Sequence, residues 1–294
     1  MRKQILIVGA GFSGMWAALS AARLASQHEN QAVDITVIAP QPELRVRPRF
    51  YENAVPTLVA PLQPLFDVTG VTFLRGTVSQ IDPAGKSVSW ADNTGETHMH
   101  SYDRLILASG SHVNRSFVTG AAEHTFDLDQ LETATVLENH LKSLAGKPES
   151  EARNTVVVCG GGFTGIEMAM ELPGRLRELL GSNAKTRVVV VDRASLPGAR
   201  YSEELREVIV QASEELGVEW LLNADIERVD ATGVMLKDGQ KIASNTVIWT
   251  VGVQANGLTA QLDAPRDSQG RLHVNSELKV VGYDDIYATG DVAC

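Results

Sequence analysis

The chain has 294 residues, 44% of them hydrophobic, and a formal net charge of −10 at pH 7. That length suffices for two ordinary domains, each with its own core. The negative charge disfavours nucleic-acid binding, because neutralising phosphates requires a concentrated surface of lysine and arginine, and we expect small-molecule partners instead. The two cysteines, Cys159 and Cys294, form neither a CxxC pair nor a zinc-binding spacing. No metal is therefore expected, and any redox chemistry needs a bound cofactor.

The N-terminal segment "MRKQILIVGAGFSG" passes directly from two cations into a buried-strand pattern and a glycine turn. It contains neither a signal-peptide cleavage site nor an apolar stretch long enough to span a membrane. The expected location is therefore the cytoplasm.

The first part of the chain predicts a strand, a glycine turn, a helix and a second strand, in the segments "QILIV", "MWAALSAARLA" and "VDITVIA". Short strands follow, up to the apolar strand in "YDRLILASG". The same order begins again at Thr155 with "TVVVCGGGFTG", "IEMAMEL" and "TRVVVVDR", and it ends at "VIWTVG". This internal repeat predicts an α/β protein with two Rossmann-like, doubly wound dinucleotide-binding domains.

Between the repeats, "DLDQLETATVLENHLKSL" predicts a helix, because acidic residues lie at its start, a lysine lies near its end and its apolar residues have helical spacing. The polar stretch "SLAGKPESEARN" after it is expected to link the two domains. The expected limits are 1–118 for the first part of one domain, 119–254 for an inserted domain with this helix and linker, and 255–294 for the rest of the first domain.

Each repeat carries a GxGxxG motif between a strand and a helix, formed by Gly9, Gly11 and Gly14 and by Gly160, Gly162 and Gly165. The first glycine permits a tight turn, the second lets a pyrophosphate approach the backbone, and the third lets helix and strand pack closely. The helix N-terminus offers free amide hydrogens to the phosphates. Two copies in this context predict two dinucleotide sites.

In such a unit, a carboxylate at the end of the second strand holds the ribose hydroxyls. The second repeat provides Asp192, which favours NADH because it repels a 2′-phosphate. Arg193 beside it could instead receive that phosphate, so NADPH stays open. The first repeat departs from the rule, with Ala39 and Pro40 at this place, and Glu43 is a nearby carboxylate that could substitute.

An ordered set of segments covers nearly the whole chain: "VGAGFSG", "RPRFYENA", "YDRLILASG", "GGGFTGIEMAMEL", "VIWTVGVQAN" and "IYATGDVA". With these segments the chain resembles the two-dinucleotide-binding-domain flavoproteins of the pyridine nucleotide-disulfide oxidoreductase superfamily, and among them the type II NADH dehydrogenases and their relatives. The resemblance implies FAD in the first domain and NAD(P)H in the second. It also identifies "IYATGDVA" with the second flavin fingerprint, whose aspartate, here Asp291, binds the ribityl hydroxyls.

The motifs and the resemblance together imply two sets of cofactor-binding residues. Those expected at the flavin are Gly9, Gly11, Phe12, Ser13, Gly14, Arg47, Val78, Ser109, Gly110, Gly290 and Asp291. Those expected at the nicotinamide nucleotide are Gly160, Gly162, Phe163, Thr164, Gly165, Asp192, Arg193 and Gly252. Ser109 replaces the threonine that the resembling proteins have in this segment.

The sequence ends directly after the GD motif, at Cys294. The resembling proteins continue with a helix that faces the flavin and with a C-terminal domain that mediates dimerisation and often touches the membrane. We therefore expect the chain to be a fragment, with a homodimer and peripheral membrane contact as properties of the longer protein. Whether the chain as given retains FAD stays open.

Hydride transfer from nicotinamide to flavin requires no protein acid or base in its first step, so the protein must stack the rings and exclude water. The resemblance places Glu167 near both rings and makes it the candidate catalytic residue. The alternative for Glu167 is a first-turn glutamate that stabilises the helix dipole.

The segment "RVRPRFYENA" has two interpretations. Arg47 or Arg49 could stabilise negative charge on a reduced flavin, and Tyr51 could line its ring. Three arginines around a proline also fit a solvated loop. Three tryptophans are expected to be packing residues: Trp16, Trp220 and Trp249.

The leading hypothesis is an FAD-dependent NAD(P)H oxidoreductase that passes electrons to a quinone or another small acceptor. Disulfide reductases and sulfide:quinone oxidoreductases are disfavoured, because the chain lacks their cysteines. A ferredoxin-type reductase stays open, although the acidic balance argues against the basic docking face that would support it. A redox or nucleotide-binding sensor similar to the apoptosis-inducing flavoproteins also stays open, because the first repeat lacks its acid at Ala39.

Overall fold

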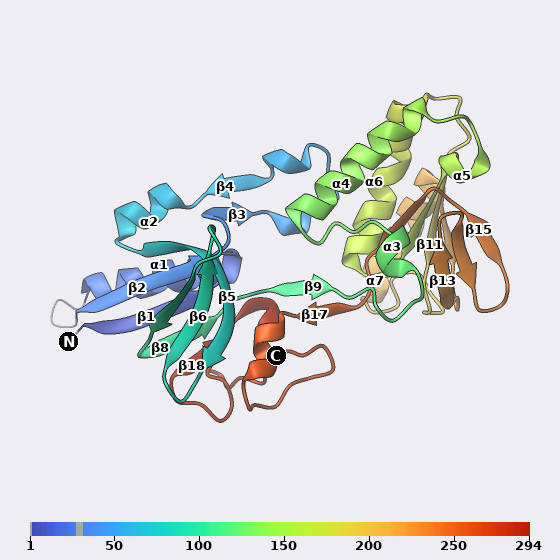
Figure 1. Cartoon of the computed structure of the whole chain (residues 1–294). Coiled ribbons are helices and arrows are strands. Elements are labelled where there is room, and N and C mark those ends of the chain that lie inside the picture. The colour runs from blue at the N-terminus through green and yellow to red at the C-terminus, as the bar shows by residue number, and fades with distance from the viewer. Residues whose placement is uncertain (1, 28–31) are drawn as a thin grey trace. The chain divides into compact units, whose positions relative to one another are not determined.

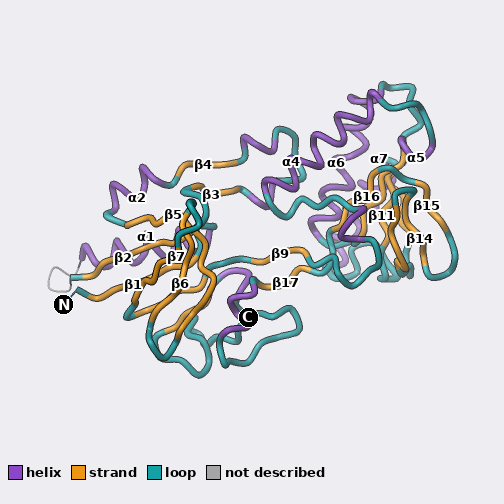
Figure 2. The backbone as a smooth tube through the Cα atoms, in the orientation of Figure 1, coloured by secondary structure: helices purple, strands orange, loops and turns teal. Residues whose placement is uncertain are grey.

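The computed structural model describes residues 2–27 and 32–294. Contacts divide the chain into two compact units, and each unit combines helices with strands (Figure 2). Unit 1 consists of Met1–Arg45, Val59–His112 and Gln254–Cys294, and unit 2 consists of Val46–Leu58 and Val113–Val253. The predicted α/β class is confirmed. The domain limits expected from the sequence stay a prediction.

Unit 1 is built on a seven-stranded sheet in the order β18-β8-β1-β2-β5-β6-β7 (Figure 1). The first five of these strands are parallel, and β6 and β7 continue the sheet in antiparallel fashion. Their bounds are Ile286–Ala288 (β18), Arg104–Leu107 (β8), Lys3–Val8 (β1), Val33–Ala39 (β2), Thr72–Asp82 (β5), Ser87–Asp92 (β6) and Thr97–Ser101 (β7).

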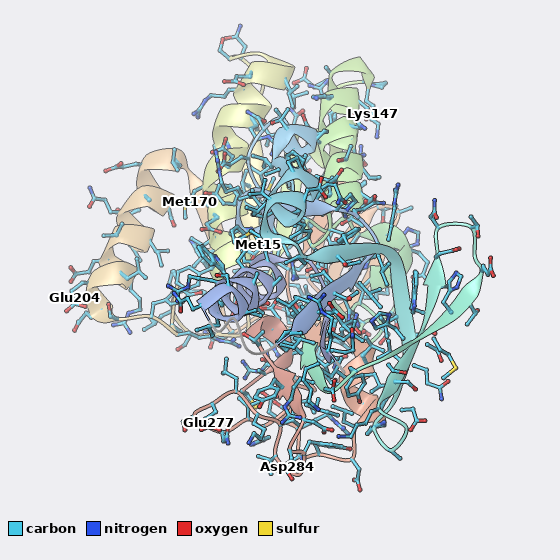
Figure 3. All side chains as sticks on the ribbon, turned by 90° about the vertical axis from the view of Figure 1, so that its left-hand side faces the viewer. Met15, Lys147, Met170, Glu204, Glu277 and Asp284 are labelled. Atoms are coloured by element: carbon cyan, nitrogen blue, oxygen red, sulfur yellow. The ribbon has the colours of Figure 1, made fainter. Side chains whose placement is uncertain are left out.

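Apolar residues cover both faces of this sheet because the central strands are apolar throughout. On one face, Ile7 packs with residues of α1 (Phe12–Gln27) and α2 (Gln63–Thr69), among them Met15, labelled in Figure 3. On the other face, Leu6 packs with residues that follow Gln254, among them Leu272. The core of unit 1 therefore needs both ends of the chain.

Unit 2 contains a parallel four-stranded sheet in the order β12-β11-β10-β16. The helices α4 (Leu131–Ser143) and α6 (Phe163–Leu180) pack on one face, and a separate antiparallel meander packs on the other. The sheet strands are Val218–Leu221 (β12), Arg187–Val191 (β11), Thr155–Cys159 (β10) and Thr246–Trp249 (β16). The meander strands are Ile226–Asp230 (β13), Gly233–Leu236 (β14) and Lys241–Ala243 (β15).

The helix α7 (Glu203–Leu216) shows how the local sequence sets helix limits. Ser202 accepts a hydrogen bond from the Leu205 amide at its start, and Glu203 and Glu204 lie in the first turn, where the helix dipole favours acids. Glu204 projects from the surface (Figure 3). Gly217 ends the helix in a left-handed conformation.

Short elements complete the chain. In unit 2 they are η1 (Arg47–Arg49), η2 (Val55–Thr57), α3 (Ala121–His124), η3 (Leu144–Gly146) and α5 (Glu151–Asn154). In unit 1 they are β3 (Glu43–Arg45), β4 (Val59–Pro61), η4 (Gly257–Gln261) and η5 (Gly290–Val292). The strands β9 (Ser111–Val113) and β17 (Val253–Ala255) pair where the chain passes between the units.

Three local expectations need correction. The stretch 143–154 does not link two units, because α4 before it and β10 after it both belong to unit 2, and Arg153 within it is buried. The helix α6 begins at Phe163, so Glu167 lies in its second turn and not at its start. Trp249 is buried as predicted, but Trp16 is 61% exposed, because it lies on the outer side of α1.

Candidate functional site

Three segments that are far apart in sequence meet at the carboxyl edge of the unit 1 sheet. The strand β8 lies between β1 and β18 and is parallel to both. The loops after Val8, Leu107 and Ala288 therefore share one edge, and the Thr289 amide donates to the Leu107 carbonyl at 2.9 Å. A Cβ on Gly290 would lie 2.6 Å from Ser13 Oγ. The first glycine motif, the "ASG" segment and the GD motif thus lie together at one edge of the sheet.

The first glycine motif has the shape that a dinucleotide requires. Gly9 has φ +109°, and a Cβ there would clash with the Ala108 carbonyl oxygen. A Cβ on Gly14 would clash with the Gly9 carbonyl oxygen, so the helix and the strand pack as closely as glycine allows. A Cβ on Gly11 would meet nothing within 4 Å, which leaves the backbone open on that side for a phosphate.

Two polar groups at this edge fit a polar ligand. The Ser109 hydroxyl is buried and has no hydrogen-bond partner within the described part of the chain, which is unusual for a buried polar atom. Asp291 is exposed and accepts a hydrogen bond from Ser111 Oγ at 2.7 Å. Gly110 lies between these two serines with φ +70°, and Phe12 is exposed at the start of α1.

Two residues expected at the flavin lie elsewhere in the fold. The Val78 side chain is buried in the core of unit 1, opposite Trp90 of β6, so only its backbone could reach a ligand. Arg47 belongs to unit 2, where it forms an ion pair with Asp129. The roles of both residues stay predictions.

An arginine of the neighbouring strand β5 lies beside the end of β2, where a ribose-binding acid is usual. Arg75 of β5 pairs in register with Ala39 and donates to the Pro40 carbonyl at 3.2 Å and to Gln41 Oε1 at 2.6 Å. Glu43 lies 3.9 Å from Arg45 Nε. Our sequence reasoning missed Arg75, because it follows Ala39 by 36 positions. A prediction that β5 pairs with β2 in parallel would have placed Arg75 beside Ala39.

The second glycine motif repeats the construction of the first. Gly160 also has φ +109°, a Cβ on Gly165 would clash with the Gly160 carbonyl oxygen, and a Cβ on Gly162 would meet nothing within 4 Å. Thr250 Oγ1 donates to the Cys159 carbonyl at 2.8 Å and holds the end of β16 beneath the loop. The same open backbone is therefore available for a second dinucleotide.

Asp192 braces this second loop. Its carboxylate accepts hydrogen bonds from the Gly161 amide and, at 2.7 Å, from the Ala194 amide. Arg193 beside it points into solvent, with a side chain that is 80% exposed and 4.0 Å from Asp225. Asp192 thus holds the loop, and the roles of Asp192 at a ribose and of Arg193 at a phosphate stay predictions.

Glu167 is half-buried on α6, between the buried residues Ile166 and Met168. Burial raises the pKa of its carboxyl group. The pKa values of Tyr51 and Tyr201 are raised first by burial and in addition by the Glu167 charge, so both phenols lie near it. Tyr201 also packs on Phe163, with ring centroids 4.2 Å apart. Thr164, the next residue of the motif, is exposed.

Gly252 is required by packing. It has φ +77°, and a Cβ there would lie 2.5 Å from Phe117 Cε1. The Asn114 amide donates to its carbonyl at 2.8 Å, and Phe117 packs on Trp249 with ring centroids 5.7 Å apart. The close approach of Phe117 explains the glycine without a ligand, so its role at the nicotinamide stays a prediction.

The arginine-rich segment is not a solvated loop. Arg47 pairs with Asp129, and Arg49 pairs with Glu52. Phe50, between the two arginines and Tyr51, is buried in the core of unit 2. The structure therefore contradicts the interpretation of this segment as a solvated loop.

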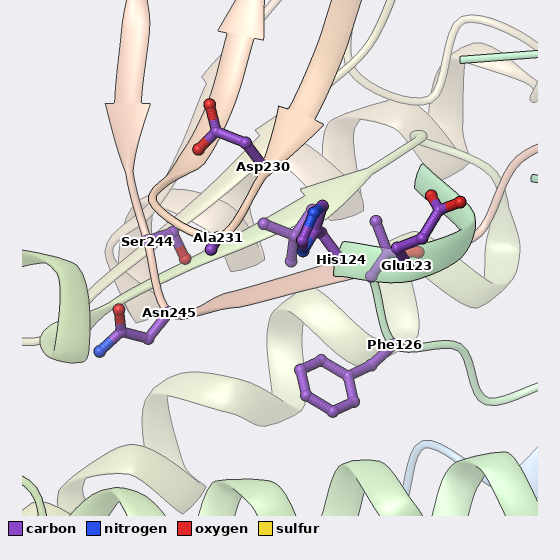
Figure 4. Close-up of a pocket in the computed structure, with 9 residues that line it drawn as sticks. Glu123, His124, Phe126, Asp230, Ala231, Ser244 and Asn245 are labelled. Carbon is purple, nitrogen blue, oxygen red and sulfur yellow. The ribbon is translucent and has the colours of Figure 1, made fainter. Parts of the chain in front are cut away.

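Other concave or charged places in unit 2 and unit 1 are less suited to a ligand. A pocket of unit 2 lies between α3 and the turns at Ala231 and Asn245, but the side chains of Glu123, Asp230 and Asn245 point in different directions (Figure 4). In unit 1, Asp92, Glu96 and His98 lie close enough to hold a metal, but the Asp92 carboxylate already accepts from the Glu96 amide and from His98. The prediction of no metal stays a prediction.

Comparison with known proteins places this geometry in context. An NADH dehydrogenase-like protein of Mycobacterium tuberculosis is 40% identical over 294 residues, covering 99% of this chain and 72% of that protein. A type II NADH:quinone oxidoreductase of Staphylococcus haemolyticus is 28% identical over 309 residues, covering 99% of this chain and 75% of that protein. The structure of NDH2 from Plasmodium falciparum in complex with NADH has the same fold, with a TM-score of 0.85 at 17% identity, and this chain spans 64% of its length.

In the described residues, no helix is both long and apolar enough to cross a membrane.

The sequence profile of the pyridine nucleotide-disulphide oxidoreductases matches residues 3–294. These findings confirm the resemblance and the assignment to an enzyme class of oxidoreductases that use pyridine nucleotides. The chain belongs to the pyridine nucleotide-disulphide oxidoreductase family.

Proposed function

We propose that the chain is an FAD-dependent NAD(P)H oxidoreductase in which unit 1 binds FAD, unit 2 binds NAD(P)H, and electrons pass to a quinone. The observation that carries the proposal is the duplicated glycine loop, with φ +109° at the first glycine and open backbone at the second glycine in both copies. The quinone is supported by the name of the Staphylococcus relative. NADH is favoured over NADPH because Asp192 lies at the end of β11.

In this function, the residues of unit 1 bind and orient. The amides that follow Gly9 and the N-terminus of α1 would hold the pyrophosphate. The Asp291 carboxylate would accept hydrogen bonds from the polar part of the flavin chain, and the Ser109 hydroxyl would donate one to it. Bound FAD would supply the acceptor for a hydride from the nicotinamide. A role for Glu167 in orienting the nicotinamide is supported by its place on α6, one turn after Phe163.

The test is the visible absorption spectrum of the purified chain, recorded before and after anaerobic addition of NADH and, separately, NADPH. We expect flavin bands that bleach faster with NADH and that return when a soluble quinone is added. A chain that stays colourless after incubation with FAD would contradict the flavin site. Flavin that is bound but bleached by neither nucleotide would contradict the hydride path.

A further inference from the structure

Segment 46–58 of unit 2 is held by two buried side chains of opposite charge. Arg175 of α6 donates from Nη1 to the Tyr51 carbonyl at 3.0 Å. Glu138 of α4 accepts from the Val55 amide at 3.1 Å. Arg175 and Glu138 are each only 6% exposed.

Ionised groups are rarely buried unless their charge is balanced, because removing them from water is unfavourable. Glu138 is balanced by Lys142, with Nζ 2.6 Å from Oε1. Burial lowers the pKa of Arg175, and the charge of Glu138 offsets part of that effect. Within the described residues, the Arg175 guanidinium makes no other hydrogen bond. The Tyr51 carbonyl is therefore its principal fixed partner.

The backbone at the other end of the segment is shaped for the Glu138 carboxylate. Ala54 adopts a left-handed conformation, with φ 57° and ψ 40°, which disfavours a residue that has a Cβ. In this conformation the amides of Ala54 and Val55 both face Glu138. Phe50 and Val55 then enter the core that also contains Leu137 and Leu172.

Tyr51 lies in segment 46–58 at the end that Arg175 holds, and Glu138 holds the other end. The backbone carbonyl of Tyr51 is held by Arg175, and its side chain packs against the core cluster that contains Met168, the residue after Glu167 on α6. The charge of Glu167 in addition raises the pKa of Tyr51, which burial raises first. We propose that Arg175 and Glu138 are positioning residues that hold segment 46–58 against α4 and α6, so that Tyr51 stays beside Glu167 and limits the access of water to it. The inference rests on the proposed function, in which Glu167 orients the nicotinamide.

The experiment compares Arg175→Met, which keeps an unbranched apolar stem but removes the charge and the donors, with Arg175→Lys, which keeps a charge and a donor. Arg177→Met is the matched control, because Arg177 is an exposed arginine on the same helix. Glu138→Gln is the second variant and tests the other end of the segment. All are measured as the full chain reconstituted with FAD.

Three readouts separate positioning from folding. Hydrogen exchange reports the order of residues 46–58, and rapid mixing gives both the NADH dissociation constant and the rate constant of flavin reduction at saturating NADH. For Arg175→Met we expect faster exchange confined to the segment and a rate constant that falls about tenfold, which corresponds to 1.4 kcal/mol. The dissociation constant should change much less, and Arg175→Lys should recover part of the rate.

The third readout does not depend on turnover. The charged groups around the two phenols are Glu167, Glu52, Arg49 and Glu171 for Tyr51, and Arg200, Glu167 and Asp192 for Tyr201. If Tyr51 moves away, water reaches Glu167, and its titration midpoint by ¹³C NMR should move down toward the ordinary value for glutamate in Arg175→Met but not in Arg177→Met.

The outcomes distinguish the two proposals. If NADH does not reduce the wild-type flavin, the proposed function fails, while exchange and the Glu167 titration still decide the positioning role. Faster exchange with an unchanged rate constant and an unchanged titration would overturn the positioning role. So would unaltered exchange in both Arg175→Met and Glu138→Gln. A general loss of stability, with exchange raised throughout unit 2, would show a structural role only.

Discussion

Ala10 in unit 1 and Gly161 in unit 2 occupy the same position between the first two glycines of their motifs. Ala10 is buried and packs with Ile7 and the residues of α1. Gly161 instead donates its amide to Asp192, and a Cβ there would lie 2.8 Å from Trp220 and 2.9 Å from Asp192. One loop is therefore braced by apolar packing and the other by a carboxylate, although the flanking glycines are alike.

A second pair of equivalent positions differs in the same sense. Trp16 on α1 and Glu167 on α6 both lie two residues after the last glycine of the motif. Trp16 is largely exposed, whereas Glu167 is partly buried near two tyrosines. The repeat preserves the turn, whereas the residues around the turn differ between the two copies in burial and in charge.

Replacement of the third glycine should have the largest effect in each unit. In Gly14→Ala and Gly165→Ala, the new Cβ would clash with the carbonyl oxygen of the first glycine, and relief of such overpacking costs about 1–3 kcal/mol or more. We expect Gly14→Ala to lose flavin and Gly165→Ala to lose NADH binding, measured by absorbance and by fluorescence titration.

Gly146→Ala is the control for both, because a Cβ at Gly146 meets nothing within 4 Å. Urea unfolding of the three variants separates loss of binding from loss of the fold. If Gly165→Ala bound NADH as tightly as the wild type, the second loop would not be the nucleotide site.

Asp192→Ala should have the next largest effect and should be confined to unit 2. The variant removes two part-buried hydrogen bonds, and the Gly161 and Ala194 amides that donate them can bind water instead, so we expect a smaller loss than in the glycine variants. We expect NADH affinity to fall at least about tenfold by calorimetry, with flavin content unchanged. Asp225→Ala, which removes an exposed acid near Arg193, should leave the NADH affinity within about twofold. Equal losses in both variants would argue that Asp192 acts only through overall charge.

Glu167→Gln should have the smallest effect on stability, and its sign depends on pH. Burial raises the pKa of Glu167, so its contribution to stability is greatest below the unfolded pKa and is lost as the pH rises through the folded pKa. The neutral glutamine should therefore unfold at higher urea than the wild type at pH 7, with the difference shrinking toward pH 4. Trp16→Gln, at the equivalent exposed position, should show no such pH dependence. A glutamine variant less stable at pH 7 would refute the effect of burial.

The sequence was sufficient for the strands and the glycine turns, because their patterns are local. The segment "VDITVIA" coincides with β2, and both motifs have the predicted strand and helix around them. Asp192 was placed correctly at a strand end, but its bond to the Gly161 amide depends on the exact height of one loop above the sheet.

Hydrogen-bond partners that lie far apart in the sequence could not be predicted from it. Nothing local connects Arg75 to Pro40 or Arg175 to Tyr51, since these pairs are brought together by strand register and helix packing. The burial of Arg153 in the polar stretch after α4 was hidden for the same reason. The fold gives these arginines fixed backbone partners that no local pattern indicates.

The interleaved order of the two units has a consequence for synthesis on the ribosome. Phe50 and Val55 leave the ribosome about a hundred residues before β10, whose strand they help to cover, at a translation rate of about 5–20 residues per second. The strand β18 comes far after β8 in the sequence and pairs with it. Early segments must therefore wait with apolar surface uncovered, so the nascent chain is expected to depend on chaperones until β18 has emerged.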